Sequence, residues 1–318
     1  MKVGIMVPSF ARWWRAEGVW ATCEKGKEIG LDSLYFADHI ITPQHQSGGN
    51  DGFMDIWTAM SYVAAVTNVQ GWSPTLGQCA AVIPYRPPIQ QAKIAATVDS
   101  LSGGRLMIGA GTGVVESEFA ALGLNVHDRG EMTDEYLKIM IELWTHPVAS
   151  FHGKYANFDE MTISVRPVQQ PHPPILVVAT GKRPFRRIAE FCQGWIPGGG
   201  RGMDAVKSAE AGWDEINALW RERGREGKPY MAIAPRFAWL TTDRADADKA
   251  TEQGYRYSYP KTHVEDMVAE IRAYADIGAN EYVVQLPSFR QGEFDYQGML
   301  LNQMELLAEH VLPKVPRG

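Results

Sequence analysis

Hydrophobic residues gather in short continuous runs, which alternate with longer stretches where apolar positions recur at helical spacing. The short runs are rich in Val, Ile, Leu and aromatic residues and predict eight strands, with eight helices between them. The predicted strands cover 2–8, 33–39, 75–84, 105–111, 175–179, 194–197, 235–242 and 281–287. The predicted helices cover 20–29, 56–66, 87–101, 132–143, 184–192, 203–220, 264–274 and 299–311.

Residues typical of helix starts agree with this division. Pro87 and Pro88 suit the first turn of the third predicted helix, where a backbone N–H group has no helical partner to lose. Thr262 and Glu265 have the spacing of a capping box at the start of the seventh predicted helix. We therefore expect the Thr262 side chain to cap that helix.

Strict alternation of strand and helix, with strands apolar on both faces, is typical of an α/β fold whose parallel sheet is covered by helices. Eight such units close into a (β/α)8 TIM barrel. A doubly wound sheet is the weaker alternative, because no GxGxxG turn follows the first strand and Val114 occupies the third glycine position of GAGTGVV (109–115). We therefore expect residues 1–318 to form a single barrel domain.

Composition excludes several classes of function. The chain has a formal net charge of −6 with dispersed Lys and Arg residues, which argues against a nucleic-acid-binding surface. No run of about 18 apolar residues predicts a membrane helix, and no secretory signal is recognisable at the start of the sequence. Three scattered cysteines fit a reducing compartment, so we expect a cytoplasmic protein. The eight histidines lack metal-binding spacing, so we expect no metal site.

Two connections are longer than usual. The segment 40–53 follows the second strand, so on a barrel it would lie where the active site is built, and it is a candidate lid. The segment 146–174 follows a helix and would start at the opposite face. Within it we expect a small hairpin over 151–158 with a structural role.

Ligands of such barrels bind at the carboxyl ends of the strands, and here those ends are mostly Gly, Ala and Pro. This composition admits a flat ligand close to the backbone. Asp38 and His39 form the one acid and imidazole pair at a predicted strand end. We interpret His39 as a proton donor or polarising group and Asp38 as an orienting group; a turn cap with an exposed histidine is the alternative.

The segment VATGKR (178–183) ends the fifth predicted strand and opens a helix. The free N–H groups of the helix start, with the side chains of Lys182 and Arg183, suit a phosphate group. A solvated basic helix start is the alternative interpretation.

Five segments carry motifs of a known family: LDSLYFADH (31–39), LSGGRLMIGAGTG (101–113), EFAALG (118–123), RGEMTDEYLKIMIELWT (129–145) and RPVQQPHPPILV (166–177). The sequence thereby resembles the bacterial-luciferase-like flavin oxidoreductases, and more narrowly the subgroup that uses the deazaflavin coenzyme F420. The resemblance is good over 1–200 and thin over 201–318. It implies a luciferase-like barrel with extended βα loops, a flavin or deazaflavin ring at its carboxyl-terminal mouth, and often a homodimer.

The resemblance also implies cofactor-binding residues, matched one by one. Asp38 and His39 would lie beside the ring, with His39 as the catalytic proton donor. The segment behind the ring would be Gln78, Cys79 and Ala80, with a non-proline cis peptide between Cys79 and Ala80. The remaining cofactor contacts would come from Gly111, Thr112 and Gly113 near the ring and from Ala179, Thr180, Gly181, Lys182 and Arg183 at the phosphate.

Three positions depart from the pattern of the deazaflavin sugar-phosphate dehydrogenases. Val114 stands where those enzymes have a catalytic glutamate, which makes that reaction doubtful. Gln44 stands where they have a tryptophan, and GWSP (71–74) is an insertion that would reshape the pocket.

These implications favour hydride transfer between F420 and a small-molecule substrate, with no nucleic-acid or membrane partner. An FMN-dependent monooxygenase, in which His39 would stabilise a flavin peroxide, is the second hypothesis. A flavin-binding protein without catalysis and a metal-dependent barrel hydrolase are the third and fourth.

Overall fold

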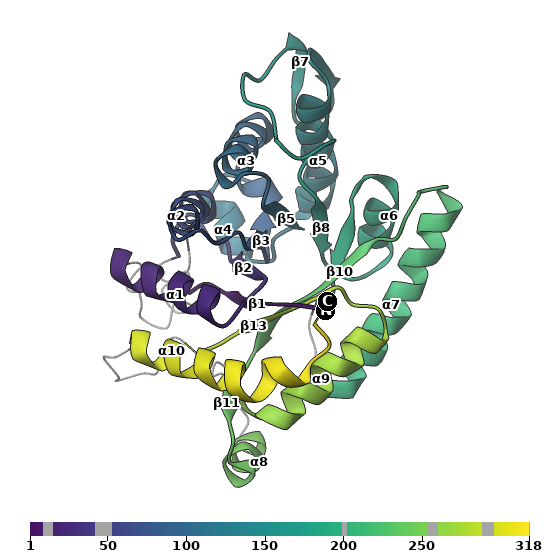
Figure 1. Cartoon of the computed structure of the whole chain (residues 1–318). Coiled ribbons are helices and arrows are strands. Elements are labelled where there is room, and N and C mark those ends of the chain that lie inside the picture. The colour runs from purple at the N-terminus through teal and green to yellow at the C-terminus, as the bar shows by residue number, and fades with distance from the viewer. Residues whose placement is uncertain (9–14, 42–52, 199–201, 253–259, 288–295, 318) are drawn as a thin grey trace.

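The protein is described here by a computed structural model covering residues 1–8, 15–41, 53–198, 202–252, 260–287 and 296–317. Parallel strands close into a barrel in the order β3-β2-β1-β13-β10-β9-β8-β5-β4, and a further pairing of β3 with β5 completes the ring (Figure 1). The strands are β1 (Lys2–Met6), β2 (Ser33–Phe36), β3 (Thr75–Gln78), β4 (Ala81–Val82), β5 (Leu106–Gly111), β8 (Ile175–Val178), β9 (Gly194–Ile196), β10 (Tyr230–Phe237) and β13 (Glu281–Gln285). The (β/α)8 prediction is confirmed, with β3 and β4 as two parts of one barrel position.

The eight predicted helices are present and surround the strands (Figure 1). They are α1 (Ala16–Glu28), α2 (Ile56–Val69), α3 (Pro88–Ser102), α5 (Arg129–Thr145), α6 (Lys182–Phe191), α7 (Gly202–Glu222), α9 (Val264–Asp276) and α10 (Tyr296–Leu306). The patterns did not predict α4 (Glu116–Ala121) or α8 (Arg244–Glu252). Short helical turns also cover Ile83–Tyr85, Val126–Asp128, Leu307–Val311 and Leu312–Lys314.

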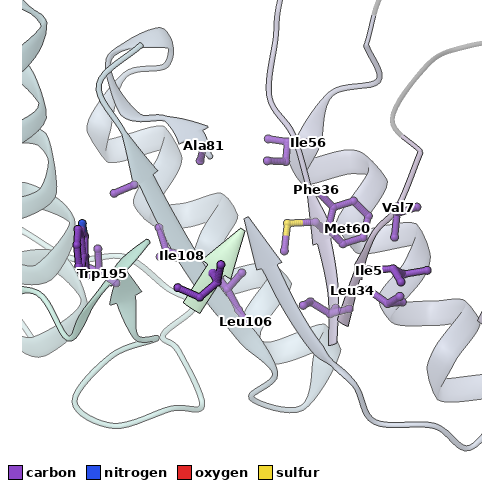
Figure 2. Close-up of a cluster of buried hydrophobic side chains, with 14 of the residues drawn as sticks. Ile5, Val7, Leu34, Phe36, Ile56, Met60, Ala81, Leu106, Ile108 and Trp195 are labelled. Atoms are coloured by element: carbon purple, nitrogen blue, oxygen red, sulfur yellow. The ribbon is translucent and has the colours of Figure 1, made fainter. Parts of the chain in front are cut away.

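The main hydrophobic core lies between the strands and the helices. Ile5 pairs in register with Leu34 of β2 and Val284 of β13, and all three are fully buried in this layer. Figure 2 shows side chains of β1 and β2 together with Ile56 and Met60 of α2. Because neighbouring residues of a strand point to opposite faces, the alternate positions fill the barrel interior. Both faces are therefore apolar, which explains the continuous hydrophobic runs.

One strand boundary was predicted wrongly. The seventh barrel strand is Tyr230–Phe237 and not 235–242, since its first residues pair with β9 and its later ones with β13. Pro235 lies where the register with β13 shifts, so the residue that begins the predicted strand sits at a bulge within the observed one. The rest of the predicted run is β11 (Trp239–Thr241), which pairs with β12 (Lys261–His263) in a separate sheet.

The predicted capping box at α9 is also wrong. The side chain of His263 accepts the N–H of Glu265 at 3.2 Å and caps the helix. The hydroxyl of Thr262 donates instead to the carbonyl of Pro260 at 3.1 Å, because β12 ends at His263 and shifts the cap position by one residue.

The hairpin expected in the long connection after α5 is confirmed. It consists of β6 (Ala149–His152) and β7 (Asn157–Met161), which pair antiparallel with Phe151 opposite Phe158. Its turn is held by Glu135 of α5, whose carboxylate accepts the N–H groups of Lys154, Tyr155 and Ala156 at 2.7–3.0 Å. The hairpin lies beside α5 at the top of Figure 1.

The LSGGR turn at the end of α3 is a structural joint. Arg105 donates to the carbonyl of Pro74 at 3.0 Å and to the side chain of Asn68 at 2.8 Å, tying the turn to the end of α2. Asp99, fully buried, accepts the N–H groups of Val168 and Gln169 at 2.7 and 3.0 Å. This motif therefore fixes the elements that enter the amino-terminal end of the barrel.

The GWSP segment lies at the same end, because it leads into the first residue of β3. Trp72 packs on α1, where a Cβ at Gly26 would lie 2.8 Å from the indole ring. The expectation that this insertion reshapes the pocket is therefore wrong, since ligands bind at the opposite end of the strands.

The amino-terminal end of the barrel interior holds a polar cluster, which we call the floor: the buried Ser33, Tyr35 and Glu281, with the partly buried Tyr230. The carboxylate of Glu281 accepts the hydroxyls of Tyr35 and Tyr230, each at 2.9 Å, and that of Ser33. A Cβ at Gly77 would lie 2.5 Å from the Tyr35 ring, so glycine leaves the space that this ring fills. Burial raises the pKa of Glu281, outweighing the hydroxyl donors that lower it.

No helix in the described part of the chain is long and apolar enough to cross a membrane.

Candidate functional site

The carboxyl-terminal end of the barrel, which we call the mouth, is lined by small side chains. Ala37 and Cys79 follow directly after β2 and β3, and they join Ala234 of β10 and Val178 of β8 in the interior cluster. By contrast, the bulky ring of Tyr35, one of the floor residues, fills the interior at the other end of the barrel. Small residues at the mouth suit a flat ligand that lies close to the backbone.

The predicted segment behind the ring has the expected backbone. The peptide bond between Cys79 and Ala80 is cis, as predicted. A Cβ at Gly111 would lie 2.8 Å from the Cβ of Ala80, so glycine permits the close pairing of β4 with β5. Burial raises the pKa of the Cys79 thiol to about 12, so this thiol is not a nucleophile at neutral pH.

Gln78 is fully buried and points away from the barrel interior. Its amide nitrogen lies 3.3 Å from the sulfur of Met60 on α2, and its side-chain oxygen has no hydrogen-bond partner among the described residues. Any contact of Gln78 with a ring in the barrel would therefore come from its backbone. That contact remains a prediction.

Asp38 is buried, and both of its oxygens are bound by Arg86. The guanidinium donates two hydrogen bonds to the carboxylate at 2.7 and 2.9 Å, and the N–H of Val82 adds a third at 3.0 Å. Arg86 also donates at 2.8 Å to Asp55, the N-cap residue of α2. Burial acts to lower the pKa of Arg86, but the two carboxylates together raise it. Asp38 thus orders the start of the loop; its predicted contact with a cofactor remains a prediction.

His39 is held by a second buried carboxylate, that of Glu118 on α4. The imidazole Nδ1 lies 3.1 Å from Glu118 Oε2, and the ring packs against Phe53 with centroids 4.6 Å apart. The His39 side chain is 32% exposed while that of Glu118 is fully buried. Glu118 also accepts the hydroxyl of Tyr85 at 2.7 Å. The predicted proton donor is thus oriented at the mouth, as a catalytic histidine requires.

The turn after β5 brings the predicted residues Thr112 and Gly113 to the same end of the barrel. Gly113 has φ of 78°, and a Cβ there would lie 2.7 Å from Phe119, so the turn needs glycine. The next residue, Val114, is 86% exposed. An exposed apolar side chain therefore occupies the position at which the sequence pattern of the deazaflavin sugar-phosphate dehydrogenases has a glutamate.

The predicted phosphate turn lies between β8 and the first residue of α6. Gly181 has φ of 120°, and a Cβ there would meet no atom within 4 Å, which leaves open space beside the helix start. Thr180 and Lys182 are exposed. Arg183 donates to Asp134 of α5 at 2.6 and 2.9 Å, so its guanidinium already forms an ion pair within the protein. Ala179 accepts the indole N–H of Trp195 through its carbonyl. Lys182 is thus the better-placed cation for an anion.

Sequence reasoning missed Arg86 and Glu118. Glu118 begins the EFAALG segment, which was used only as a family motif, and nothing in its local sequence indicates that it faces His39. The predicted lid lies mostly outside the described residues, as does Gln44. No group of three or more His, Cys, Asp or Glu side chains in the described ranges is arranged to hold a metal ion.

Comparison with known sequences identifies relatives along most of the chain. The profile of luciferase-like monooxygenases matches residues 4–309. An uncharacterized Mycobacterium tuberculosis protein, Rv0953c, is 33% identical over 225 residues, or 66% of this chain and 76% of that protein. An F420-dependent glucose-6-phosphate dehydrogenase of Amycolatopsis mediterranei is 28% identical over 92% of each chain. An FMNH2-dependent dimethylsulfone monooxygenase of Pseudomonas putida is 30% identical over 64% of this chain and 52% of that enzyme.

Comparison with solved structures supports the same fold. The monooxygenase RslO1 from Streptomyces bottropensis superposes with a TM-score of 0.79 at 19% identity, covering 98% of this chain and 99% of that one. An F420-dependent secondary alcohol dehydrogenase, solved with an F420-acetone adduct, gives a TM-score of 0.76 at 16% identity over 99% of each chain. At such identities the likeness concerns the fold alone.

Proposed function

Because this chain belongs to the family of luciferase-like monooxygenases, we propose that it is an oxidoreductase that transfers a hydride between coenzyme F420 and a small organic substrate. The observation that carries the proposal is His39, partly exposed at the mouth and held through Nδ1 by the buried carboxylate of Glu118. A histidine fixed in this way can donate or accept a proton at its other nitrogen while the cofactor exchanges a hydride.

Two observations support the fit of such a cofactor at the mouth. Small side chains, Ala37, Cys79 and Ala234, leave the backbone approachable by a flat ring. Gly181 leaves open space at the start of α6, where N–H groups and Lys182 suit a phosphate. Bound there, the deazaflavin would supply a carbon that carries hydride without activating oxygen. The chain itself positions the ring and holds a proton at His39.

A match along most of the chain favours F420 over FMN. The F420-dependent dehydrogenase of Amycolatopsis mediterranei matches over 92% of this chain, whereas the FMNH2-dependent monooxygenase of Pseudomonas putida matches over 64% of it. The 30% identity of the latter nevertheless makes an FMN-dependent monooxygenase the second candidate. In that case FMN would supply oxygen chemistry when bound, and His39 would still be the residue that holds a proton at the mouth.

Val114 argues against a sugar phosphate as the substrate. It offers an exposed isopropyl group at the end of β5, beside the predicted ring position. Ile40 and Ile41, which follow His39, are also 42% and 51% exposed. These side chains favour a neutral, partly apolar organic substrate over a charged sugar. The homodimer implied by the family resemblance is part of the proposal, and light scattering of the purified chain tests it.

Titration of the purified protein with F420 and, separately, with FMN tests the cofactor. Fluorescence of each compound is followed at low and high salt, with riboflavin as a control that lacks the phosphate. We expect F420 to bind more tightly than FMN and its affinity to fall with salt. Tighter binding of FMN would select the second candidate. Binding of neither compound would reject both.

A further inference from the structure

We propose that Glu118 is a positioning residue that decides which nitrogen of His39 carries the proton: Glu118 holds Nδ1–H and leaves Nε2 for the ligand. Only the proton transfer assigned to Nε2 rests on the proposed function. The arrangement of the two side chains does not depend on which cofactor binds.

The donors around Glu118 determine the direction of each hydrogen bond. Oε1 accepts the backbone N–H groups of Ile40 and Ile41 at 2.7 and 3.2 Å. Oε2 accepts the hydroxyl of Tyr85 at 2.7 Å and lies 3.1 Å from Nδ1 of His39. Backbone N–H groups can only donate, so Oε1 cannot carry a proton toward them. Three of the four contacts of this carboxylate come from groups that donate to it, and the fourth, Nδ1 of His39, completes the set when it also donates its hydrogen.

Two contacts then fix the plane of the ring. Glu118 holds its Nδ1 edge, and Phe53 covers part of one face with an interplanar angle of 43°. The side chain remains 32% exposed. The same carboxylate holds the backbone of the two residues after His39, so the orientation of the ring and the position of residues 40 and 41 are set together.

Nitrogen-15 NMR of the full chain, labelled at histidine and free of cofactor, tests the inference directly. The His39 signals are identified by their loss in His39→Asn. We expect the neutral ring of the wild-type protein to be protonated at Nδ1. A neutral His39 protonated at Nε2 would overturn the proposal, and this measurement needs no Glu118 variant.

Glu118→Gln provides a second, sharper test. The side-chain oxygen of glutamine must face the two backbone donors, so its NH2 group comes to lie against Nδ1 of His39 and the hydroxyl of Tyr85. We therefore expect the tautomer to reverse, with the proton on Nε2. Glu116→Gln, at an exposed residue of the same helix, is the matched control and leaves the spectrum unchanged. A Glu118→Gln protein that keeps Nδ1–H would refute the role of Glu118.

The two proposals fail in different ways. A wild-type protein that shows Nδ1–H but does not bind F420 in the fluorescence titration refutes the cofactor and leaves the positioning role intact. A protein that binds F420 but whose neutral His39 is protonated at Nε2 refutes the positioning role of Glu118 and leaves the cofactor proposal intact.

Discussion

At the floor of the barrel Glu281 is surrounded by neutral hydroxyl groups, whereas at the mouth Asp38 faces a guanidinium and Glu118 faces an imidazole. The floor thus holds its carboxylate with hydrogen bonds from neutral hydroxyl groups. Burial raises the pKa of Glu281 by more than these hydrogen bonds lower it. The mouth uses groups that carry or can acquire a positive charge. The two buried carboxylates at the mouth are therefore paired with a cation and with an imidazole, while the carboxylate inside the opposite end of the barrel is paired with neutral hydroxyl groups.

The largest effect on stability is expected from Arg86→Met. It leaves Asp38 buried with the N–H of Val82 as its remaining donor, and breaking such a pair costs about 3–5 kcal/mol of unfolding free energy. Urea unfolding measures the change. Adding Asp38→Asn to the same protein should recover part of the loss.

Arg183→Met is the matched control for that experiment. Its ion pair with Asp134 is half-exposed, so the cost should stay below about 1 kcal/mol. Equal losses in the two variants would show that burial does not distinguish the mouth from the surface.

His39→Ala tests the chemistry of the mouth. Turnover should fall about 100-fold or more, the usual contribution of a general acid, while F420 affinity changes less than about tenfold. Steady-state kinetics with a substrate found by screening neutral alcohols and ketones, together with fluorescence titration, separates the two effects. Unchanged turnover would remove His39 from the mechanism.

Glu281→Gln tests the floor. The pKa of Glu281 is raised in the folded protein above its ordinary value of 4.5, so the folded state binds the proton more tightly than the unfolded chain. The stability from this proton is complete below about pH 4.5 and is lost as the pH rises through the folded pKa.

Unfolding free energies of wild type and Glu281→Gln are to be compared across pH. The wild type should lose stability relative to the variant as pH rises, with a slope no steeper than about 1.4 kcal/mol per pH unit. F420 affinity should be the same in both. A difference in unfolding free energy that does not vary with pH, or a change in affinity, would contradict the separation of floor and mouth.

The smallest effect is expected from Lys182→Ala. An exposed cation at the start of α6 should contribute about fivefold to F420 affinity at low salt and less at high salt. Arg186→Ala, exposed one turn further along the same helix, is the control and should leave affinity unchanged. If neither variant nor salt alters binding, the phosphate is held elsewhere.

The sequence alone was sufficient to predict the barrel because parallel strands buried on both faces leave continuous apolar runs. It was misleading where one residue has two common meanings: Pro235 suggested a strand start and lies instead at a bulge inside β10. The helix α8 was missed because RADADKATE has little apolar periodicity.

The sequence could predict only those site residues that stand at the end of a recognisable strand. Asp38 and His39 stand at the end of β2, and their position alone drew attention to them. Their partners Arg86 and Glu118 lie 48 and 79 residues away, and no spacing rule joins residues so distant in sequence. Such pairs follow from the closure of the barrel, which places the ends of different strands together.

The joint made by Asp99 and Arg105 bears on how proteins of this kind are grouped by sequence pattern. LSGGR ties the end of α2 to α3, and Asp99 just before it holds the segment that leads into β8, all at the amino-terminal end of the barrel. A pattern built on it selects chains that share an architecture, whatever reaction they catalyse. His39, Arg86, Val114 and Glu118, which the structure places at the mouth, lie outside that pattern, so a substitution at any of them would leave the match to the pattern intact.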